Sequence, residues 1–388
     1  MRILHSVYSL GSKASGLYHS VPSIAKCSTH PDNTVELWTV GDTDLHEQGL
    51  FSVRSFAPDP MPFKTLNKLV RSDKMRVSAL RSQFDIYHIH GLWAMPAVYP
   101  AEAARRFRKP LLISPHGMLG RDALQFSKAA KIAFSFLWQQ NVLRSATCFH
   151  ATADSEVDDI REFGMRQPVA VIPNGIHLPK LESLVPAQQH YPGGQTVPFI
   201  LSLGRIHPKK ALDRLISAFA LVAPTATNWR LRIVGQDERG YASQLQGLVR
   251  QHALCGKVTI EPPVYGEEKY RLMREAAVFV LPSLHENFAN VVAESLSVET
   301  PVISSKGAPW SGLVSNKCGW WVEHGSAAIA EALSEAMRMP AEVRREMGVR
   351  GRAWIGRDFG WDGIQSKFLE LHRWVSGQGD IPQFIRFK

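Results

Sequence analysis

The segment GRIHPKK, residues 204–210, combines a glycine with several basic side chains at a point where chemistry is possible. It follows a predicted strand at 199–203 and leads into a predicted helix at 210–222. Free backbone N–H groups and the positive end of the helix dipole favour an anion at such a place. Arg205 offers a planar fork for phosphate and Lys210 a point charge, so the pair could neutralise a diphosphate without a divalent metal. Solvated basic residues near a helix start are the alternative.

A second segment, HENFANVVAE at residues 285–294, follows a predicted strand at 278–281. We expect Glu286 in the loop that leaves this strand, and Glu294 about two turns into a helix predicted at 288–298. Glu294 lies among apolar residues, where a carboxylate needs hydrogen-bonding partners. Sugar or ribose hydroxyls would supply them. The alternative makes Glu286 a helix cap and Glu294 an exposed helix residue.

Three histidines, His88, His90 and His116, lie at the ends of strands predicted at 85–90 and 110–115. Glycine follows the last two of them, which lets backbone and imidazole approach a ligand together. We favour His116 as a site residue. A metal site is open to such imidazoles, but no carboxylate lies near enough in the sequence to complete a facial triad. An ordinary hydrogen-bonded core or loop histidine is the alternative at each position.

The loop after the first predicted strand reads LGSKASG, residues 10–16, and matches neither G-x-G-x-x-G nor a phosphate-binding lysine–serine pair. This argues against a dinucleotide-dependent dehydrogenase and against a nucleotide triphosphatase. Gly16 could still bring the backbone close to a phosphate, and a plain turn is equally compatible with the sequence. The chain shows no G-x-S-x-G elbow and no cysteine nucleophile arrangement.

The elements that must position these residues alternate between apolar strands and amphipathic helices, which is typical of parallel sheets covered on both faces. In the first half we expect strands at 2–9, 34–40, 51–56, 85–90, 110–115, 148–151 and 169–172, and helices at 63–84, 97–107, 128–145 and 154–163. Residues 179–198 are rich in proline and glycine and predict an inter-domain linker. The alternation then restarts, with strands at 199–203, 230–234, 258–260, 278–281 and 301–304, and helices at 210–222, 241–252, 267–276 and 288–298. From about residue 325 the chain is predicted to be mostly helical.

Composition places the chain among ordinary globular proteins. Of its residues, 45% are apolar and 21% are charged. Its length of 388 residues predicts two or three domains. Four widely spaced cysteines show neither metal-binding nor disulfide spacing. No apolar run is long enough for a membrane span, and no secretory signal is evident, so we expect a soluble, cytoplasmic protein.

The formal net charge is +10, and residues 1–150 hold 18 basic against 10 acidic side chains. Many of the basic ones fall in the stretches 64–81 and 105–109. Nucleic acid, an anionic membrane face or phosphate-bearing substrates are the partners that such charge attracts. A solvated basic face is the alternative. No nucleic-acid-binding motif is present, so we expect no nucleic acid partner.

These segments together resemble the family 4 (group 1) glycosyltransferases, two-domain enzymes of the GT-B fold. The resemblance covers nearly the whole chain and rests on the order of its motifs: HIHG at 88–91, SPHG at 114–117, VIPNGI at 171–176, LSLGRIHPKKALDRLISAF at 201–219 and HENFANVVAESLSVETPVISS at 285–305. The stretch GAPWSGLVSNKCGWWV at 307–322 is similar to the exopolysaccharide and lipopolysaccharide branch.

The resemblance implies an α/β, GT-B fold with two Rossmann-like parallel-sheet domains facing across a cleft. Residues 1–182 would form the acceptor-side domain, with the C-terminal helix at 362–388 packing back on it, and residues 195–361 the donor-binding domain. The implied activity is retaining, metal-independent transfer of a hexosyl unit from GDP-mannose or a UDP-sugar to a saccharide or lipid-linked glycan in cell-surface polysaccharide synthesis. No cofactor is implied.

The resemblance also assigns roles to individual residues. Arg205 and Lys210 would hold the diphosphate, Glu294 the ribose hydroxyls, and His116 would lie near the sugar on the acceptor side. Glu286 would bind the transferred sugar together with the backbone around Asn287, Phe288, Ala289, Asn290 and Val291. Gly16 would approach the phosphates, and the base would lie near Gly235 and Val264. The four catalytic candidates are thus Glu286, His116, Arg205 and Lys210.

This chain departs from the family at two positions where glycine is frequent, namely Ala211 and Ala289, and at a glycine pair that is replaced here by Ser15-Gly16. Ala289 adds a methyl group where backbone would meet the sugar, which bears on donor preference. A sugar-nucleotide epimerase of the same architecture is the alternative function. The basic first domain predicts peripheral contact with an anionic membrane at the cytoplasmic face.

Overall fold

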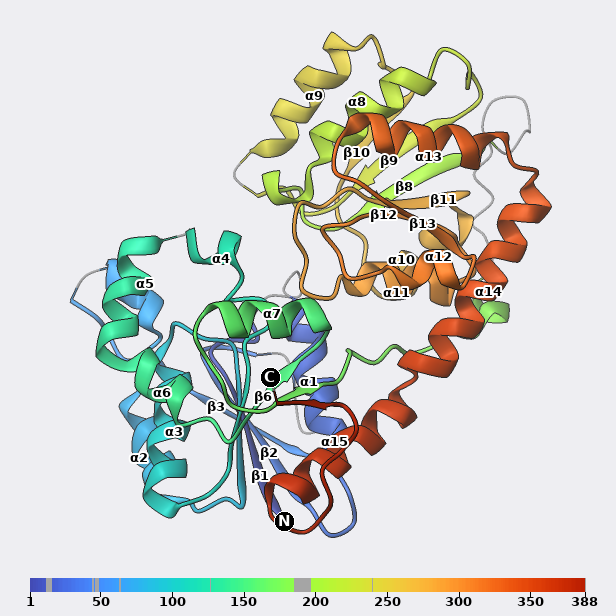
Figure 1. The fold of residues 1–388 in the computed structure, drawn as a ribbon. Coiled ribbons are helices and arrows are strands. Elements are labelled where there is room, and N and C mark those ends of the chain that lie inside the picture. The colour runs from blue at the N-terminus through green and yellow to red at the C-terminus, as the bar shows by residue number, and fades with distance from the viewer. Residues whose placement is uncertain are drawn as a thin grey trace. The chain divides into compact units, whose positions relative to one another are not determined.

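The computed structural model describes residues 1–11, 16–43, 45, 49–62, 64–125, 127–184, 197–238 and 240–387, with side chains of residues 64–66 excepted. The chain divides into two compact units (Figure 1). Unit 1 comprises Met1–Gly175 and Trp361–Lys388, and unit 2 comprises Ile176–Gly360. Each unit is built around its own sheet, eight-stranded in unit 1 and six-stranded in unit 2. The predicted α/β class with two parallel sheets is confirmed.

The sheet of unit 1 has the order β14-β7-β6-β5-β4-β1-β2-β3, and only β14 runs antiparallel to its neighbour. The chain builds outward from β1 to β3, then crosses to the other side of β1 to form β4. The direction of winding therefore reverses between β1 and β4. The strands are Arg2–Val7 (β1), Thr34–Val40 (β2), Ser52–Phe56 (β3), Ile86–His90 (β4), Leu111–Ser114 (β5), Cys148–Ala151 (β6), Val169–Val171 (β7) and Ile385–Arg386 (β14).

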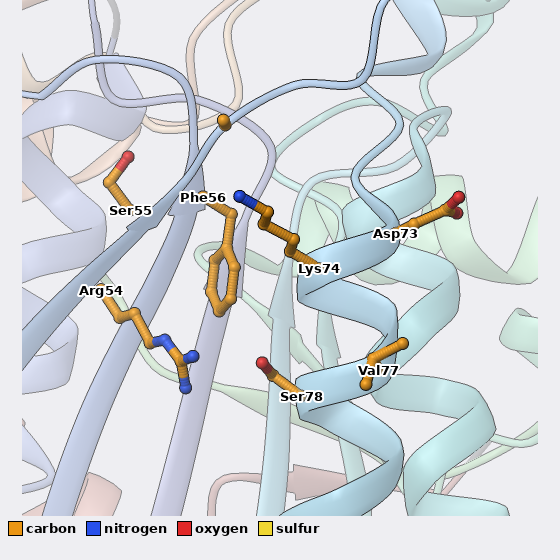
Figure 2. Close-up of a pocket in the computed structure, with 8 residues that line it drawn as sticks. Arg54, Ser55, Phe56, Asp73, Lys74, Val77 and Ser78 are labelled. Atoms are coloured by element: carbon orange, nitrogen blue, oxygen red, sulfur yellow. The ribbon is translucent and has the colours of Figure 1, made fainter.

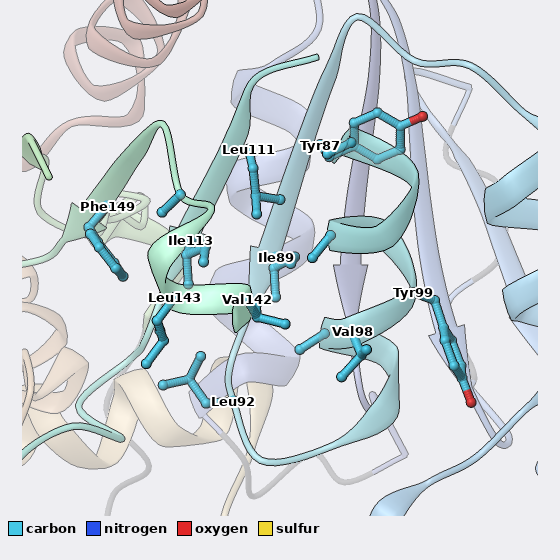
Figure 3. Packing of buried hydrophobic residues seen from close by; sticks show 14 of the residues in the cluster. Tyr87, Ile89, Leu92, Val98, Tyr99, Leu111, Ile113, Val142, Leu143 and Phe149 are labelled. Atoms are coloured by element: carbon cyan, nitrogen blue, oxygen red, sulfur yellow. The ribbon is translucent and has the colours of Figure 1, made fainter. Parts of the chain in front are cut away.

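Helices cover both faces of this sheet. One face packs under α2, α3, α6 and α7 through buried residues such as Ile89, Val98 and Leu143 (Figure 3). The other face packs against α1 and α15, with Phe368 fully buried. The helical segments are α1 (Gly16–Cys27), η1 (Lys64–Leu69), α2 (Asp73–Arg81), α3 (Met95–Phe107), α4 (Arg121–Gln125), α5 (Lys128–Phe134), η2 (Ser135–Gln139), α6 (Gln140–Arg144), α7 (Asp154–Glu162) and α15 (Trp361–Val375).

The single helix predicted at 63–84 is wrong. The structure shows the short 3-10 segment η1, then a break at Val70, whose φ is +51°, and then α2. The Ser72 hydroxyl caps α2 by accepting a hydrogen bond from the Met75 amide. The helix predicted at 128–145 is interrupted by one π-helical turn, η2. In the sequence, Ser72-Asp73 was a helix-start signal that separates η1 from α2.

Unit 2 has the strand order β10-β9-β8-β11-β12-β13, and all its pairings are parallel. Its strands are Phe199–Leu203 (β8), Arg230–Val234 (β9), Val258–Glu261 (β10), Val278–Leu281 (β11), Val302–Ser305 (β12) and Gly319–Val322 (β13). Its helical segments are η3 (Leu181–Ser183), η4 (Pro208–Lys210), α8 (Leu212–Val222), α9 (Tyr241–Gln251), α10 (Gly266–Glu275), α11 (Asn290–Ser297), α12 (Gly312–Ser315), α13 (Ser326–Arg338) and α14 (Ala341–Phe359). The edge strand β13 was not predicted.

The last part of the chain returns to unit 1. Helix α15 lies against α1, and the Gln365 side chain donates a hydrogen bond to the Thr29 carbonyl at 3.1 Å. Beyond it, Ile385 pairs with Ala170 of β7. The helix expected at 362–388 therefore ends at Val375, and the segment after it forms the edge strand β14, so this part of the chain completes both a face and an edge of the unit 1 sheet.

All four cysteines are free. Burial raises the pKa of the Cys27, Cys148 and Cys318 thiols to about 12, so these side chains behave as small apolar groups. Within the described part of the chain, no helix combines the length and apolarity that a membrane crossing requires.

Candidate functional site

The sheet of unit 2 creates a natural binding position between β8 and β11. The chain winds outward from β8 to β10 and then crosses over to β11, so the loops after β8 and β11 diverge in opposite directions. In open parallel sheets, ligands bind beyond the carboxyl ends of the strands at such a reversal. The two segments singled out in the sequence, 204–210 and 285–294, follow these two strands.

Lys210 and Glu286 form an ion pair across this reversal. The Lys210 ammonium donates to Glu286 Oε1, and the Ser283 hydroxyl donates to the same oxygen at 2.6 Å. Both partners are mostly shielded, with side-chain exposures of 19% and 17%. The structure thus brings together two residues that are 76 positions apart in the sequence.

Backbone contacts fix the loops that carry this pair. The Leu284 amide donates to the Lys209 carbonyl at 3.0 Å, and the Glu286 amide donates to the Gly307 carbonyl at 2.7 Å. A Cβ at Gly307 would lie 2.4 Å from the Ser283 carbonyl oxygen, so only glycine lets the loop after β12 approach this closely. Loops from three neighbouring strands therefore position the Glu286 carboxylate.

Burial of the Glu286 carboxyl acts to raise its pKa, because the charged form loses hydration. The charge and hydrogen bond of Lys210, the hydrogen bond from Ser283 and the charge of Arg205 act in the opposite direction and prevail. The net pKa of Glu286 lies below its ordinary value, so the carboxylate is ionised at neutral pH. An ionised carboxylate is a pure acceptor and suits hydroxyl groups.

Arg205 lies on the same loop as Lys210 but is more exposed, with half of its side chain accessible. Its guanidinium pairs with Glu238 at 3.2 Å, a residue of the loop after β9 that sequence reasoning missed. The two predicted diphosphate-binding cations therefore each hold a carboxylate partner here. An anionic ligand would compete with Glu238 and Glu286 for them.

Lys210 is not in the first turn of α8, as the sequence predicted. It ends the 3-10 turn η4, and Ala211 follows with a left-handed φ of +48° before α8 begins at Leu212. The His207 ring caps η4 by accepting a hydrogen bond from the Lys209 amide at 3.1 Å. Lys210 thus precedes the helix at its positive end, where an anion is favoured.

Gly235, predicted to lie near the base, supports the Arg205 loop through direct backbone contact. The Gly204 amide donates to the Val234 carbonyl at 3.0 Å, and the Ile206 amide to the Gln236 carbonyl at 2.8 Å. A Cβ on Gly235 would lie 1.7 Å from the Gly204 carbonyl oxygen, which no side chain can occupy.

We expect Gly235→Ala to lower the free energy of unfolding by about 3 kcal/mol, because backbone must move to admit the methyl group. Urea unfolding measures this change. Gly247→Ala is the matched control, since Gly247 lies within α9 and nothing is within 4 Å of an added Cβ. That variant should gain up to about 1 kcal/mol. Equal stability of Gly235→Ala and the parent would contradict the close approach.

The start of α11 carries the segment predicted to meet the transferred sugar. Helix α11 begins at Asn290, so Phe288 precedes it and Glu294 lies about one turn inside, rather than two. Phe288 is buried against Trp310, and its carbonyl accepts the Trp310 indole N–H at 2.5 Å. The first N–H groups of an α-helix have no acceptor inside the helix, so the amino-terminal end of α11, at Asn290, favours an anion or another hydrogen-bond acceptor.

Ala289 and Ala211, the two departures from glycine, both have left-handed backbone, with φ of +64° and +48°. This conformation costs an alanine roughly 1–2 kcal/mol and costs glycine little. The chain therefore keeps the backbone geometry of a glycine at both places without the glycine.

Because of this strain, we expect Ala289→Gly to raise the free energy of unfolding by up to about 1 kcal/mol, after the entropy of glycine in the unfolded chain is subtracted. The control is Ala353→Gly in the exposed interior of α14, which should lose about 1 kcal/mol. Chemical denaturation of both variants gives the two signs. A loss at both positions would contradict the account.

Glu294 has a partner that the sequence did not reveal. Lys269 of α10 donates to its Oε1 at 2.8 Å, and both side chains are mostly shielded. Burial, followed by the charge of Glu294, raises the pKa of the neighbouring Tyr270 hydroxyl. Val264, predicted to lie near the base, packs half-buried against the same core as Ala289 and Val291.

In unit 1, His116 follows β5 with a left-handed φ of +53°, and Gly117 continues the turn at +74°. Glu156, which is buried, accepts hydrogen bonds from the Gly117 amide at 2.7 Å and the Thr152 amide at 2.8 Å. Gly16 is the first residue of α1, and no described atom lies within 4 Å of the position that a Cβ would take. The preceding residues 12–15 of the predicted loop lie outside the described part of the chain.

Three buried imidazoles of unit 1, those of His5, His88 and His90, lie close enough for a metal ion, with ring nitrogens within 4.8 Å of one another. Hydrogen bonds already engage them: His5 Nδ1 with His90 Nε2 at 2.9 Å, and His88 Nε2 with the Ser114 hydroxyl at 2.8 Å. A metal would have to break these bonds. The predicted donor-binding residues are not part of this cluster.

Two hollows lie next to β3 in unit 1, with volumes of about 580 and 620 Å³. Figure 2 shows the first, between Arg54 and Phe56 on β3 and Lys74 and Ser78 on α2. No predicted site residue lines either hollow. The hollows therefore do not mark the site that the sequence and the sheet reversal point to.

Comparison with known protein families gives two matches along the chain. Residues 189–354 match the family described as glycosyl transferases group 1, and residues 28–175 match the glycosyl transferase 4-like domain. A D-inositol 3-phosphate glycosyltransferase of Nocardiopsis dassonvillei is 30% identical over 76% of this chain and 72% of its own length. A GDP-mannose:cellobiosyl-diphosphopolyprenol alpha-mannosyltransferase of Xanthomonas oryzae is 24% identical over 80% of this chain and 79% of its own. The chain spans 61% of the length of a Streptomyces avermitilis relative.

Solved structures share the fold across nearly the whole chain. Sucrose-phosphate synthase from Thermosynechococcus elongatus superposes with a TM-score of 0.78 at 20% identity, covering 97% of this chain and 99% of that one. Anabaena Alr3699/HepE in complex with UDP and glucose has a TM-score of 0.75 at 19% identity, covering 96% and 99%. The GT-B fold is thereby confirmed.

Proposed function

Because the chain belongs to the group 1 glycosyltransferases, we propose that it transfers a hexosyl unit from a nucleotide-diphosphate sugar, GDP-mannose or a UDP-sugar, to a saccharide or lipid-linked glycan. Residues 195–361 would bind the donor and residues 1–182 the acceptor side, with the C-terminal helix completing the latter. The product would be a cell-surface polysaccharide. One observation carries the proposal: Lys210 and Glu286 meet where the winding of the unit 2 sheet reverses.

The proposed donor site uses the observed ion pairs as exchangeable partners. When a diphosphate binds, Lys210 turns from Glu286 to phosphate, and Arg205 turns from Glu238. The freed Glu286 carboxylate then accepts hydrogen bonds from sugar hydroxyls. Glu294, about one turn inside α11, accepts those of the ribose. The diphosphate thus takes the charges of Lys210 and Arg205, and hydrogen bonds from sugar hydroxyls replace the ion pair at Glu286.

The chemistry that this arrangement serves is the departure of a nucleoside diphosphate. As the bond between the anomeric carbon and the phosphate oxygen breaks, negative charge grows on that oxygen. Arg205, Lys210 and the amide groups at the start of α11 would stabilise this charge in the transition state. A phosphate oxygen takes the proton of the acceptor hydroxyl, and the new glycosidic bond forms on the same face with retention. Two cations suffice in this scheme, without a divalent metal.

Support for transfer over sugar-nucleotide epimerisation comes from the named relatives, which are glycosyl- and mannosyltransferases. The X. oryzae relative's name specifies GDP-mannose and a polyprenol-linked acceptor, and the Anabaena structure contains UDP and glucose. These two names motivate the two donor bases that we propose.

A thermal-shift screen with UDP, GDP and ADP tests the donor proposal, because a ligand that binds only the folded state raises the melting temperature. We expect one of the first two to raise it and Lys210→Ala to remove the shift. Incubation with the matching nucleotide sugar alone distinguishes the alternative, since an epimerase converts the donor without an acceptor. No shift with any of the three nucleotides would contradict the proposal.

We further propose peripheral contact between unit 1 and an anionic membrane at the cytoplasmic face. Ile132, Phe136 and Leu137 are exposed by 60%, 85% and 54% on α5 and η2, next to the basic Lys128. Apolar side chains flanked by lysine suit a lipid interface, and the basic stretches 64–81 and 105–109 add to the attraction.

Sedimentation with vesicles containing anionic lipid tests this contact. We expect Phe136→Ser to weaken binding severalfold, whereas Leu221→Ser, at a residue equally apolar and 64% exposed in unit 2, should leave it unchanged. Added salt should weaken binding of the parent. Binding that ignores lipid charge, salt and Phe136 would rule the contact out.

A further inference from the structure

A row of hydrogen-bonded imidazoles leads from the interior of unit 1 to His116. His5 Nε2 contacts the Ser28 hydroxyl at 2.9 Å, and His5 Nδ1 contacts His90 Nε2 at 2.9 Å. His90 Nδ1 then contacts His116 Nε2 at 3.1 Å. Ser28, His5 and His90 are buried, whereas His116 is partly exposed at the end of the row.

Each of these rings carries a single N–H at neutral pH. Burial lowers the pKa of His5 and His90 well below the ordinary value, and it lowers that of His116 to about 3. A neutral imidazole has one donor nitrogen and one acceptor nitrogen. Every contact in the row needs one proton, so fixing the donor at one end fixes the tautomer of all three rings.

The direction of the row is set at Ser28. Its hydroxyl donates to the Ile24 carbonyl at 3.2 Å, so it can only accept from His5 Nε2–H. His90 Nε2–H must then donate to His5 Nδ1, and His116 Nε2–H to His90 Nδ1. In the reversed arrangement the Ser28 hydroxyl would donate to His5 instead and give up the Ile24 carbonyl. The first arrangement keeps one more hydrogen bond.

In a second row of hydrogen bonds in the same sheet, an obligate acceptor again determines which ring nitrogen is protonated. His150 Nε2 lies 2.8 Å from the Ile172 carbonyl, an obligate acceptor, so this nitrogen carries the proton. The Ser114 hydroxyl must then donate to His150 Nδ1 and accept from His88 Nε2–H. This leaves His88 Nδ1 unprotonated, and that atom indeed has no hydrogen-bond partner among the described residues.

We propose that Ser28, His5 and His90 are positioning residues that hold His116 as its Nε2–H tautomer, so that Nδ1 presents a lone pair to a sugar hydroxyl. The sugar hydroxyl rests on the proposed function, whereas the tautomer does not. No hydrogen bond joins His116 Nδ1 to another described residue, which leaves it available as an acceptor. The Ser28 hydroxyl thus determines the tautomer of the partly exposed His116 through three successive hydrogen bonds.

The test is nitrogen-15 NMR of histidine-labelled full-length protein, in which the chemical shifts of the two ring nitrogens reveal which one is protonated. We expect His5, His90 and His116 all to show Nε2–H at pH 7. Ser28→Ala removes the acceptor of His5 Nε2–H, and a buried unpaired donor is disfavoured. The row should therefore reverse, and His116 should shift toward Nδ1–H. Assignments come from spectra that lose one signal on substitution of each histidine.

Ser20→Ala is the matched control. Ser20 lies on α1, which ends one residue before Ser28, and like Ser28 it bonds to the carbonyl four residues earlier, but it forms no described contact with a histidine. Its His116 signals should match those of the parent. Ser28→Thr, which keeps a hydroxyl, should also retain the parent tautomer.

A wild-type spectrum with Nδ1–H at His116 would overturn the proposal without any variant, as would an unchanged His116 in folded Ser28→Ala. In transfer assays we expect Ser28→Ala to lower kcat about tenfold with nucleotide affinity unchanged, since one hydrogen bond to a hydroxyl is at stake. Should the parent bind no nucleotide, the proposed function fails while the spectra still decide the tautomer.

Discussion

Replacing Lys210 with alanine is expected to lower glycosyl transfer between tenfold and more than a hundredfold. The substitution removes one charge-assisted contact to the donor's diphosphate, worth about 1.5–3 kcal/mol. It also strips the shielded Glu286 carboxylate of its cation, after which burial raises the pKa of Glu286 from its depressed value. Arg205→Ala should cost a similar factor in transfer but little stability, because that side chain is half exposed.

Matched controls lie at the opposite, amino-terminal edge of the same sheet. Arg230 begins β9, and Lys257 precedes β10, where its ammonium bonds to the Ala223 carbonyl. Alanine at either position should leave transfer unchanged. Initial rates with saturating acceptor compare the four variants. Unchanged turnover in both Arg205→Ala and Lys210→Ala would remove these residues from the donor site.

On acidification, unit 1 is expected to unfold at a higher pH than is usual for acid denaturation of proteins. Among the described residues of this unit, six histidines have a pKa that is lowered first of all by loss of hydration in the fold; it falls to about 3 for His116 and His372, and to about 4 for His150. The others are His5, His88 and His90, which lie well below the ordinary value. Each group therefore takes up its proton in the unfolded chain near pH 6.5 and in the folded chain only at far lower pH.

The direction in which pH changes the stability of unit 1 follows from this difference in pKa. As pH falls below about 6.5, the unfolded state binds protons that the folded state refuses, and the free energy of unfolding decreases. Between pH 7 and pH 5.5 each histidine lowers it by roughly 1 kcal/mol, and the six together by on the order of 6 kcal/mol. Domain stabilities are about 5–15 kcal/mol, so unit 1 should be close to its unfolding midpoint at pH 5.5.

Urea titrations of the full chain at pH 7, 6 and 5.5 measure this loss. His372→Leu sharpens the test, because neither ring nitrogen of His372 has a hydrogen-bond partner among the described residues. The variant should be more stable at pH 5.5 and should lose about one sixth of the pH dependence. A free energy of unfolding that stays flat from pH 7 to pH 5.5 would show that these imidazoles titrate normally.

Most strands of both sheets were predictable from the sequence because buried parallel strands are short, continuous apolar runs; the edge strands β13 and β14 were not predicted. Strands such as Thr34–Val40 and Arg230–Val234 were predicted with the observed ends. The strand Gly319–Val322 was missed, since its two tryptophans are only half buried at the sheet edge. The prediction at 63–84 failed because amphipathic residues continue through the break at Val70.

The sequence was sufficient to locate the candidate site, but it did not reveal which residues form ion pairs there. Arg205, Lys210, Glu286 and Glu294 were identified from strand-to-loop position, whereas their partners Glu238 and Lys269 were not. Pairing depends on which strands are neighbours, and sheet order is not written in local residue patterns. His5 was passed over for the same reason: only the register of β1 against β4, which pairs His5 with His88, brings its ring within hydrogen-bonding distance of His90.

A crystal structure with the nucleoside diphosphate that most raises the melting temperature tests the central claim most directly. The account predicts that the paired phosphates bond to Arg205 and Lys210, that Glu286 has released Lys210, and that a ribose hydroxyl bonds to Glu294. A diphosphate bound elsewhere in the chain, with the Lys210–Glu286 pair intact, would contradict it.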